Sequence, residues 1–287
     1  MSIKPVTILS ILLLAACTQA PKVDYEIVKL STPVIIDCKG GKYNKGKITE
    51  LQILTDNVVI KHCQINGSIR TVGLGHNGEA KRVKASSILP NHTQRAQAAA
   101  PKNTVLYDLT ITGYGRIPLY LGPGTTRFTI YDSTINGHSN SVALYLDAES
   151  GYNIIRNNDF SLLTNTREVI ALDGSANNQL LANNINNAGN GGIYLYRNCG
   201  EGGTVRHQSP QNNFISGNTI HNTGGYGIWL GSRNGGRFYC NADDGFPFGS
   251  SKDNRDFAHN NVIKRNTFLN SSRTVRDDGN NQVIPAP

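Results

Sequence analysis

The sequence carries a repeat of about 25 residues, which limits the folds open to the chain more than any other feature. A short segment ending in an aliphatic or aromatic residue recurs, with successive end points 46, 24, 25, 25, 35 and 48 residues apart. The spacing of 46 is either two units or one unit with an insertion, and 35 and 48 are units with insertions. The end points are Ile65, Ile111, Ile135, Phe160, Ile185, Ile220 and Phe268.

Asparagine recurs two positions before four successive end points. The earlier segments have Cys63, Leu109 and Ser133 at this position, and the later ones have Asn158, Asn183, Asn218 and Asn266. Side-chain amides stacked at one position of a repeat can hydrogen-bond to each other along the stacking axis. The sequence therefore predicts an asparagine ladder at a turn of each unit.

Each unit also contains a second apolar triplet. Its outer residues are aliphatic and alternate with a variable middle residue, which predicts a strand whose middle residue points outward. The five triplets are Leu119–Leu121, Leu144–Leu146, Ile170–Leu172, Ile193–Leu195 and Ile228–Leu230.

Several short strands in each 25-residue coil, with N-x-I/F turns, resemble the pectate-lyase-like superfamily. The resemblance implies an all-β fold, a single-stranded right-handed parallel β-helix (a solenoid) over residues 31–270. A leucine-rich repeat has a shorter period and a leucine consensus that is absent here. No W-x-D-H, N-T-D, G-H-G, R-I-K or D-P-H-D segment occurs. The resemblance therefore implies the fold and does not assign residue roles.

The N-terminus is typical of an exported lipoprotein. Lys4 precedes a short apolar run, so residues 1–16 are expected to be a signal peptide. The segment that ends at Cys17 resembles the bacterial lipobox, which implies lipidation of Cys17; the alternative is an ordinary signal peptide. By the same resemblance, Thr18 favours sorting to the outer membrane. Residues 17–30 would be a tether, with the domain in the periplasm or at the cell surface.

Three insertions interrupt the predicted solenoid, at residues 73–103, 197–211 and 232–260, and residues 271–287 are expected to form a C-terminal tail. The first insertion is expected to be a long loop or short helix laid over one face. It begins with a G-x-G-x-x-G segment at Gly73, and a dinucleotide site would need a strand before it and a helix after it. Neither is evident, so nucleotide binding is not expected.

Four cysteines remain after Cys17. The segment ending at Cys63 repeats the segment ending at Cys38 after 25 residues, which would place these two cysteines one above the other and allow a disulfide. Cys199 and Cys240 would then pair by default. A cysteine metal site is not expected, because no C-x-x-C spacing occurs.

The outward residues of the second strand form two columns. The first contains Tyr120, Tyr145, Ala171, Tyr194 and Trp229, and the second contains Gly122, Asp147, Asp173, Tyr196 and Gly231. Exposed rings in such a column can stack on sugars, so a glycan-binding strip is predicted, with Arg167 and Arg233 as further substrate-binding residues. The alternative is that a loop covers the rings as ordinary core.

Asp147 is expected directly beneath Asp173, at about 5 Å. Three uses of such a pair remain open. The pair could be the acid and nucleophile of a retaining glycosidase. It could bind Ca²⁺ with Glu149 or Glu168, as the ion site of pectate lyases would suggest. It could also form a structural ion pair with Arg167, Arg197 or Arg206.

β-Elimination from a uronate needs a cation to neutralise the sugar carboxylate, a base for the C5 proton and an acid for the leaving oxygen. The 197–211 insertion offers Arg197 and Arg206 as cations and His207 as the base. Tyr196 or Tyr194 could act as the acid.

These features predict a carbohydrate-active lipoprotein that cleaves an extracellular acidic polysaccharide by β-elimination. The alternatives are a glycoside hydrolase that uses the aspartate pair and a non-catalytic glycan-binding or envelope scaffold protein. The formal charge of +8 suits an acidic partner. Nucleic-acid binding is not expected, because basic and aromatic residues do not interleave in a stripe. The protein is expected to be a monomer on its lipid anchor.

Overall fold

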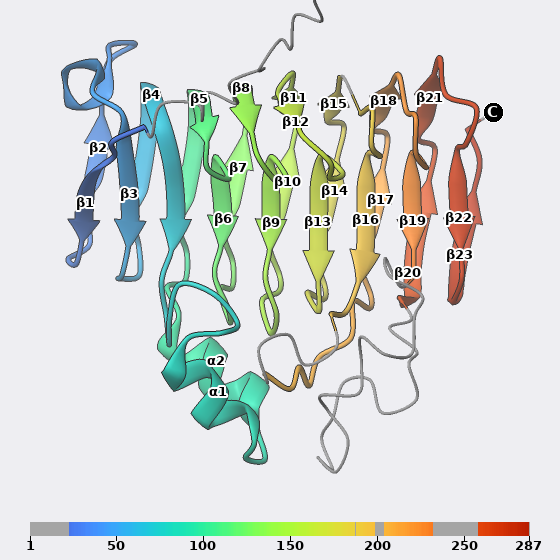
Figure 1. The fold of residues 1–287 in the computed structure, drawn as a ribbon, viewed down its shortest axis with the longest axis horizontal. Helices are drawn as coiled ribbons and strands as arrows, with labels where there is room; N and C mark the ends of the chain where they lie inside the picture. Colours follow the sequence, from blue (N-terminus) through green and yellow to red (C-terminus); the bar gives the residue numbers. More distant parts are fainter. Residues whose placement is uncertain (1–22, 187, 199–203, 232–257, 287) are drawn as a thin grey trace, which may run out of the picture.

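The computed structural model describes residues 23–186, 188–198, 204–231 and 258–286. Their strands form one continuous parallel sheet wound into a right-handed β-helix (Figure 1). The predicted fold class is therefore confirmed. Among the described residues, no helix is both long enough and apolar enough to cross a membrane.

One face of the solenoid, here called the front sheet, takes one strand from each coil. In spatial order its strands are β1 (Glu26–Leu30), β3 (Thr49–Ile53), β4 (Val59–Thr71), β6 (Leu119–Leu121), β9 (Leu144–Leu146), β13 (Ile170–Asp173), β16 (Ile193–Tyr196), β19 (Ile228–Leu230) and β22 (Val275–Asp277). Figure 1 views this face, with the coils running from the N-terminal to the C-terminal end.

The remaining strands form the rear sheet, which β4 joins to the front sheet. Its first row is β2 (Ile35–Asp37), β5 (Val105–Gly115), β7 (Thr129–Tyr131), β10 (Ile154–Arg156), β14 (Gln179–Leu181), β17 (Phe214–Ser216), β20 (His259–Lys264) and β23 (Asn280–Ile284). Its second row is β8 (Thr134–Ser139), β11 (Asp159–Phe160), β12 (Leu163–Thr164), β15 (Asn184–Ile185), β18 (Thr219–His221) and β21 (Thr267–Leu269). One 3₁₀ turn, η1, spans Tyr43–Gly46.

The core consists of inward aliphatic side chains stacked from coil to coil. One column runs through β7, β10, β14 and β17, where Ile130, Ile155, Leu180 and Ile215 pair in register and have no exposed surface. Burying each such side chain contributes about 1.5–3 kcal/mol. Each coil therefore depends on its neighbours for a closed core, which is why a constant period specifies the fold.

The predicted asparagine ladder is present. The Nδ2 groups of Asn158, Asn183 and Asn218 each donate to Oδ1 of the next member, at 2.9–3.0 Å, and the ladder ends at Asn266. The structure also contains a second ladder that was not predicted, made by Asn153, Asn178, Asn213, Asn261 and Asn281. Four of its members lie five residues before a member of the first ladder, so the signal was available in the sequence.

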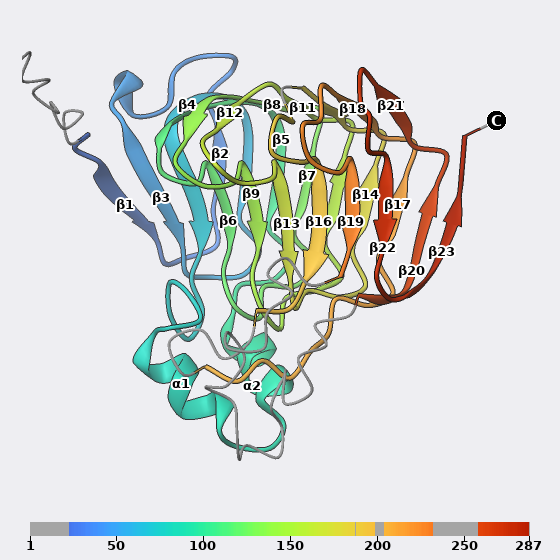
Figure 2. The same cartoon turned by 45° about the vertical axis from the view of Figure 1, so that its right-hand side comes forward.

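The first insertion folds into α1 (Lys81–Ser87) and α2 (His92–Ala99), which lie at the end of the coils where β6 and β9 finish (Figures 1 and 2). The G-x-G-x-x-G segment does lie between a strand and a helix, contrary to the sequence interpretation. A Cβ at Gly75 would come within 2.1 Å of the Ala80 Cβ. This glycine therefore allows the loop to pack closely against its own helix.

Cys38 and Cys63 form the predicted disulfide, with their Cα atoms 4.8 Å apart. The signal peptide, Cys17, Cys199, Cys240 and Arg233 lie outside the described residues.

Both ends of the solenoid extend further than expected. Part of the predicted tether forms β1, which pairs with β3, and part of the predicted tail forms β22 and β23, which add a further coil.

Candidate functional site

The predicted register of the outward columns is confirmed. Tyr120, Tyr145, Ala171, Tyr194 and Trp229 are successive partners across the front sheet, and Asp173 pairs with Tyr196. The prediction that the aromatic column is an exposed strip is wrong, because Tyr120 and Tyr194 are only 5% and 6% exposed.

These outward rings are buried because they pack against one another. The Tyr120 and Tyr145 rings stack with centroids 5.7 Å apart, and Tyr194 meets Trp229 edge to face at 5.2 Å. The Trp229 indole N–H donates to Asp278, and Arg276 lies over the same ring. The outer face of the sheet therefore carries a small apolar cluster of its own.

Asp147 and Asp173 share one cation. An Arg206 Nη2 atom lies 3.5 Å from Asp147 Oδ1 and 3.3 Å from Asp173 Oδ2, and all three side chains are almost fully buried. The backbone and side-chain N–H groups of Asn198 donate to Asp173 at 2.7 and 2.5 Å, and the Tyr145 hydroxyl donates to the same carboxylate. Of the three uses considered for the pair, the ion pair with an arginine is the one observed.

Asp147 is the member of the pair that faces a cavity. It accepts hydrogen bonds from the Tyr120 hydroxyl and, at 2.7 Å, from the Ala148 backbone N–H. Burial raises the pKa of Asp147 above its usual range, the charge of Arg206 opposes this effect, and the nearby Asp173 adds to it. Burial, together with the adjacent carboxylates, also raises the pKa of Tyr120 and Tyr145 well above 10, so both phenols stay protonated near neutral pH.

The four carboxylates proposed as Ca²⁺ ligands do not form one group. Glu149 accepts from the Thr93 hydroxyl and from the His207 backbone N–H, whereas Glu168 is bound by Arg167 and by the Tyr196 hydroxyl. In the described part of the chain, no three His, Cys, Asp or Glu side chains are placed to hold a metal ion. The Arg206 guanidinium already takes the position of a cation beside the aspartate pair, so this site does not fit Ca²⁺.

The residues proposed for β-elimination are not gathered at one point. The Tyr196 hydroxyl donates to Glu168 at 2.9 Å, and the Tyr194 hydroxyl donates to the Asn190 carbonyl at 3.0 Å. The His207 ring packs 5.1 Å from the ring of His92. Arg197 contacts Ser209. None of these predicted acid, base or cation residues lines the cavity beside Asp147, and of the predicted catalytic set only Asp147 and Arg206 do so.

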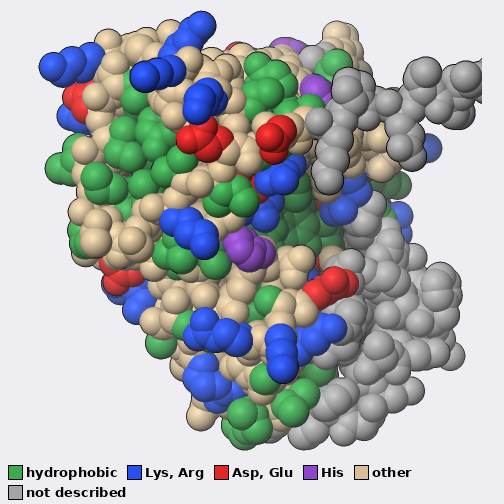
Figure 3. Space-filling model, turned by 60° about the vertical axis from the view of Figure 1, so that its left-hand side comes forward, with side chains coloured by type: hydrophobic (Ala, Val, Ile, Leu, Met, Phe, Trp, Pro, Cys, Tyr) green, Lys and Arg blue, Asp and Glu red, His purple; other side chains and the backbone are tan. Residues whose placement is uncertain are grey.

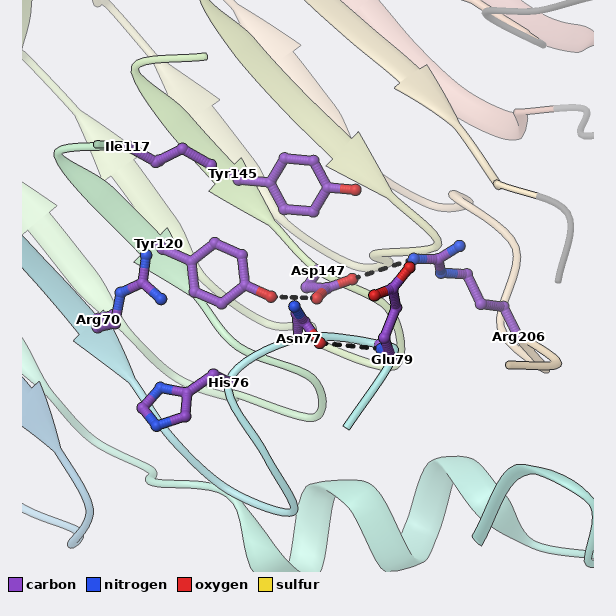
Figure 4. Close-up of a pocket in the computed structure, with 10 residues that line it drawn as sticks. Arg70, His76, Asn77, Glu79, Ile117, Tyr120, Tyr145, Asp147 and Arg206 are labelled. Carbon is purple, nitrogen blue, oxygen red and sulfur yellow. Dashed lines mark hydrogen bonds and ion pairs between the residues drawn. The ribbon is translucent and has the colours of Figure 1, made fainter. Parts of the chain in front are cut away.

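The cavity beside Asp147 has a volume of about 340 Å³ and lies over β4, β6 and β9 (Figure 4). It adjoins a second hollow of about 550 Å³, with which it shares Arg70, His76 and Ile117. Together they form what is here called the front cleft. Figure 3 shows Arg, Lys and His side chains gathered around a hollow on this side of the molecule. The polar and aromatic residues that line the front cleft include Glu50, Gln52, Arg70, His76, Asn77, Glu79, Arg116, Asn140, Tyr120, Tyr145, Asp147 and Arg206.

Sequence reasoning missed the basic residues of this cleft. Arg70 is the register partner of Tyr120, so it continues the outward column one coil toward the N-terminus. Its guanidinium lies 4.9 Å from the centre of the Tyr120 ring and 3.5 Å from Glu50, which also binds Arg116 at 2.5 Å. Extending the column by one unit would have found Arg70. His76 and Glu79 lie in the first insertion, where the repeat gives no position.

A family model described as a right-handed β-helix region matches residues 72–242. Among solved structures, the chain is similar to an alginate lyase from Paenibacillus sp. str. FPU-7, with 12% identity, a TM-score of 0.39, and coverage of 88% of this chain and 98% of that chain. The A-module of Azotobacter vinelandii mannuronan C-5 epimerase AlgE6 gives 12% identity, a TM-score of 0.32, and coverage of 84% and 70%. The Dettilon tailspike protein gives 13% identity, a TM-score of 0.39, and coverage of 91% of this chain and 60% of that chain. No curated protein matches. The matched family region spans more than half of the sequence, and the chain belongs to the right-handed β-helix family.

Proposed function

We propose that this protein binds an acidic polysaccharide in the front cleft and cleaves it by β-elimination. The observation that carries the proposal is the composition of the cleft. It brings the guanidinium groups of Arg70, Arg116 and Arg206 together with an imidazole, His76, and a tyrosine–carboxylate hydrogen bond. Cations, a group that can accept a proton near neutral pH and a proton donor are the three requirements of elimination from a uronate.

Binding would rest on Arg70 and Arg116, which share the carboxylate of Glu50. Arg116 is 44% exposed and Arg70 is 17% exposed, so both guanidinium groups can reach a ligand in the cleft. Each guanidinium has five N–H donors and can contact Glu50 and a sugar carboxylate at once. Neutralising that carboxylate makes the C5 proton of the uronate more acidic.

The elimination step would begin at His76, an exposed residue on the rim of the front cleft. Its imidazole takes the proton from C5, the electron pair of that C–H bond forms the C4=C5 double bond, and the C4–O bond breaks. The leaving oxygen then needs a proton.

That proton would come from the Tyr120–Asp147 pair. Tyr120 is a donor and not a base, because its pKa is raised well above 10. Asp147 has a raised pKa and becomes protonated more easily than an exposed aspartate. When Asp147 is protonated, the hydrogen bond between the two reverses, and the Tyr120 hydroxyl is released to donate to the leaving oxygen.

The geometry counts against a glycosidase that uses the aspartate pair. A retaining glycosidase needs both carboxyl groups beside the sugar. Asp173 has no exposed surface, is held by Asn198, Tyr145 and Arg206, and does not line the cleft. Export and lipidation at Cys17 remain part of the proposal, and they would place the cleft at the cell envelope, where such polymers occur.

The proposal is tested by incubating the purified protein with a panel of polyuronates and following both ultraviolet absorbance and reducing ends. We expect new unsaturated ends, because elimination leaves a C4=C5 double bond. His76→Ala should lower the rate by at least about a hundredfold, the loss typical of removing a general base. Arg70→Gln should weaken substrate binding. Arg156→Ala is the control, because Arg156 is exposed on the rear sheet and lines no part of the cleft. A chelator should leave the rate unchanged.

The possible outcomes separate the candidate functions. Reducing ends without ultraviolet absorbance would replace the lyase with a hydrolase. Binding that Arg70→Gln weakens, without any turnover on the whole panel, would identify a glycan-binding scaffold. Neither binding nor turnover would end the carbohydrate proposal.

A further inference from the structure

One turn of the coils carries a column of left-handed backbone. In seven coils the residue at this turn has a φ between +55° and +59°. The backbone N–H groups of Arg127 and Tyr152 donate along the column to Gly151 and Ala176, at 3.3 and 3.2 Å. Asparagine adopts this conformation more readily than most residues. The column is Asn57, Asn103, Arg127, Tyr152, Asn177, Asn212 and Asn260, so only two adjacent coils depart from asparagine.

The two departures line one pocket. Thr126 pairs with Gly151 across the adjacent coils, so the residues that follow them, Arg127 and Tyr152, lie side by side. They form one wall of a pocket of about 300 Å³, and α2 forms the opposite wall. Tyr152 is 57% exposed, which makes it the third most exposed large hydrophobic side chain of the described residues, after Ile35 at 70% and Leu163 at 61%. The other lining residues are Gln94, Gln97, Ala98, Lys102 and Thr126.

The pocket carries two positive charges that no carboxylate of the described residues balances. In the described ranges, neither the Lys102 ammonium nor the Arg127 guanidinium has a carboxylate within ion-pair distance. The nearby Asp56 carboxylate accepts instead from the Lys102 backbone N–H, at 2.8 Å. The α2 wall is held in place, because the Gln97 amide donates to the Glu149 carbonyl at 2.9 Å.

We propose that this pocket is a second saccharide-binding site, which takes one acidic sugar unit of a polysaccharide. The apolar face of the sugar stacks on the exposed Tyr152 ring, and its carboxylate binds between Arg127 and Lys102. The pocket shares no lining residue with the front cleft. The choice of an acidic sugar over other anions rests on the proposed function. A second site would hold a long polymer on the protein between cleavage events, which raises its effective concentration at the cleft.

The test replaces Arg127 and Tyr152 by asparagine, the residue that the neighbouring coils carry at this turn. The double variant Arg127→Asn/Tyr152→Asn removes the cation and the ring, and asparagine suits the left-handed backbone, so the fold should be retained. Calorimetry with a uronic-acid hexamer should find two binding sites per chain in the unaltered protein. In the double variant, binding at one of them should weaken by at least about tenfold. A glucose hexamer, which carries no carboxylate, should bind more weakly to this pocket.

Arg265→Asn is the matched control. Arg265 also has left-handed backbone, with a φ of +54°, is exposed, and lines none of the three pockets discussed here. It therefore loses the same charge in the same conformation, and we expect it to keep both sites. If the front cleft does not bind saccharide, the unaltered protein will show one site, which the double variant will lose. Unchanged binding by the double variant, or no hexamer binding by the unaltered protein, would overturn the second site.

Discussion

At the scale of single residues, the sequence placed the charges but did not identify their partner. The repeat put Asp147 and Asp173 on adjacent coils, because both follow an apolar triplet at the same position. It offered three arginines as partners, and the structure selects Arg206. That residue belongs to an insertion, where no period relates sequence position to position in space. Insertions of this kind are the part of a solenoid that sequence reasoning does not place.

Replacing Arg206 should unfold the protein more easily than replacing an exposed arginine. Arg206→Met leaves two buried carboxylates without their cation, and breaking a buried ion pair in this way destabilises a protein by about 3–5 kcal/mol. Arg156→Met, on the exposed rear face, should change the free energy of unfolding by less than about 1 kcal/mol. Urea titration at neutral pH measures both values.

The effect of Arg206→Met should also depend on pH. Without the arginine, the pKa of the buried Asp147 rises further, so the folded state binds a proton that the unfolded state has lost. Stability then falls as the pH rises above the ordinary aspartate pKa and recovers as the pH falls toward it. The deficit of the variant should therefore be smaller near pH 4 than near pH 7. An equal deficit at both pH values would show that Asp147 does not titrate in this way.

At the scale of elements, each coil is joined to the next by side-chain amides as well as by strand pairing. In the first ladder Asn183 accepts from the backbone and side-chain N–H groups of Asn158, and its own amide donates to Asn218 and to the Ile155 carbonyl. The sequence predicted this ladder because four asparagines share one position. The second ladder is as regular, but its members precede the N-x-I/F turn that marks the repeat, so the period did not point to it.

The loss of stability on replacing Asn183 should depend on whether the new side chain can accept a hydrogen bond, as the serine at this position of an earlier coil does. Ser133 occupies the same position in an earlier coil, where its hydroxyl accepts from the Leu109 backbone N–H at 3.1 Å. Asn183→Ala leaves the Asn158 backbone N–H unsatisfied in the core, a loss of about 1–3 kcal/mol for that group alone. Asn183→Ser should lose less, because a hydroxyl can still accept. Thermal unfolding of both variants provides the comparison, and equal losses would contradict the role given to the ladder.

At the scale of the whole molecule, the fold followed from the period but the site did not. The constant spacing specified a solenoid, its outward columns and one disulfide, all of which depend on register. The front cleft is built differently. Arg70 and Tyr120 of the coils form its floor. Its walls come from the first insertion and from Arg206 of the 197–211 insertion. The predicted aromatic strip failed for the same reason, since register says which way a ring points but not what packs over it.

A crystal structure of the protein with a uronic-acid hexamer tests the proposed function most directly. We expect a sugar in the front cleft, with its carboxylate about 2.7–3.2 Å from the guanidinium of Arg70 or Arg116 and with His76 beside C5. Density for the hexamer on the rear sheet alone, or a front cleft without sugar at saturating hexamer, would contradict it.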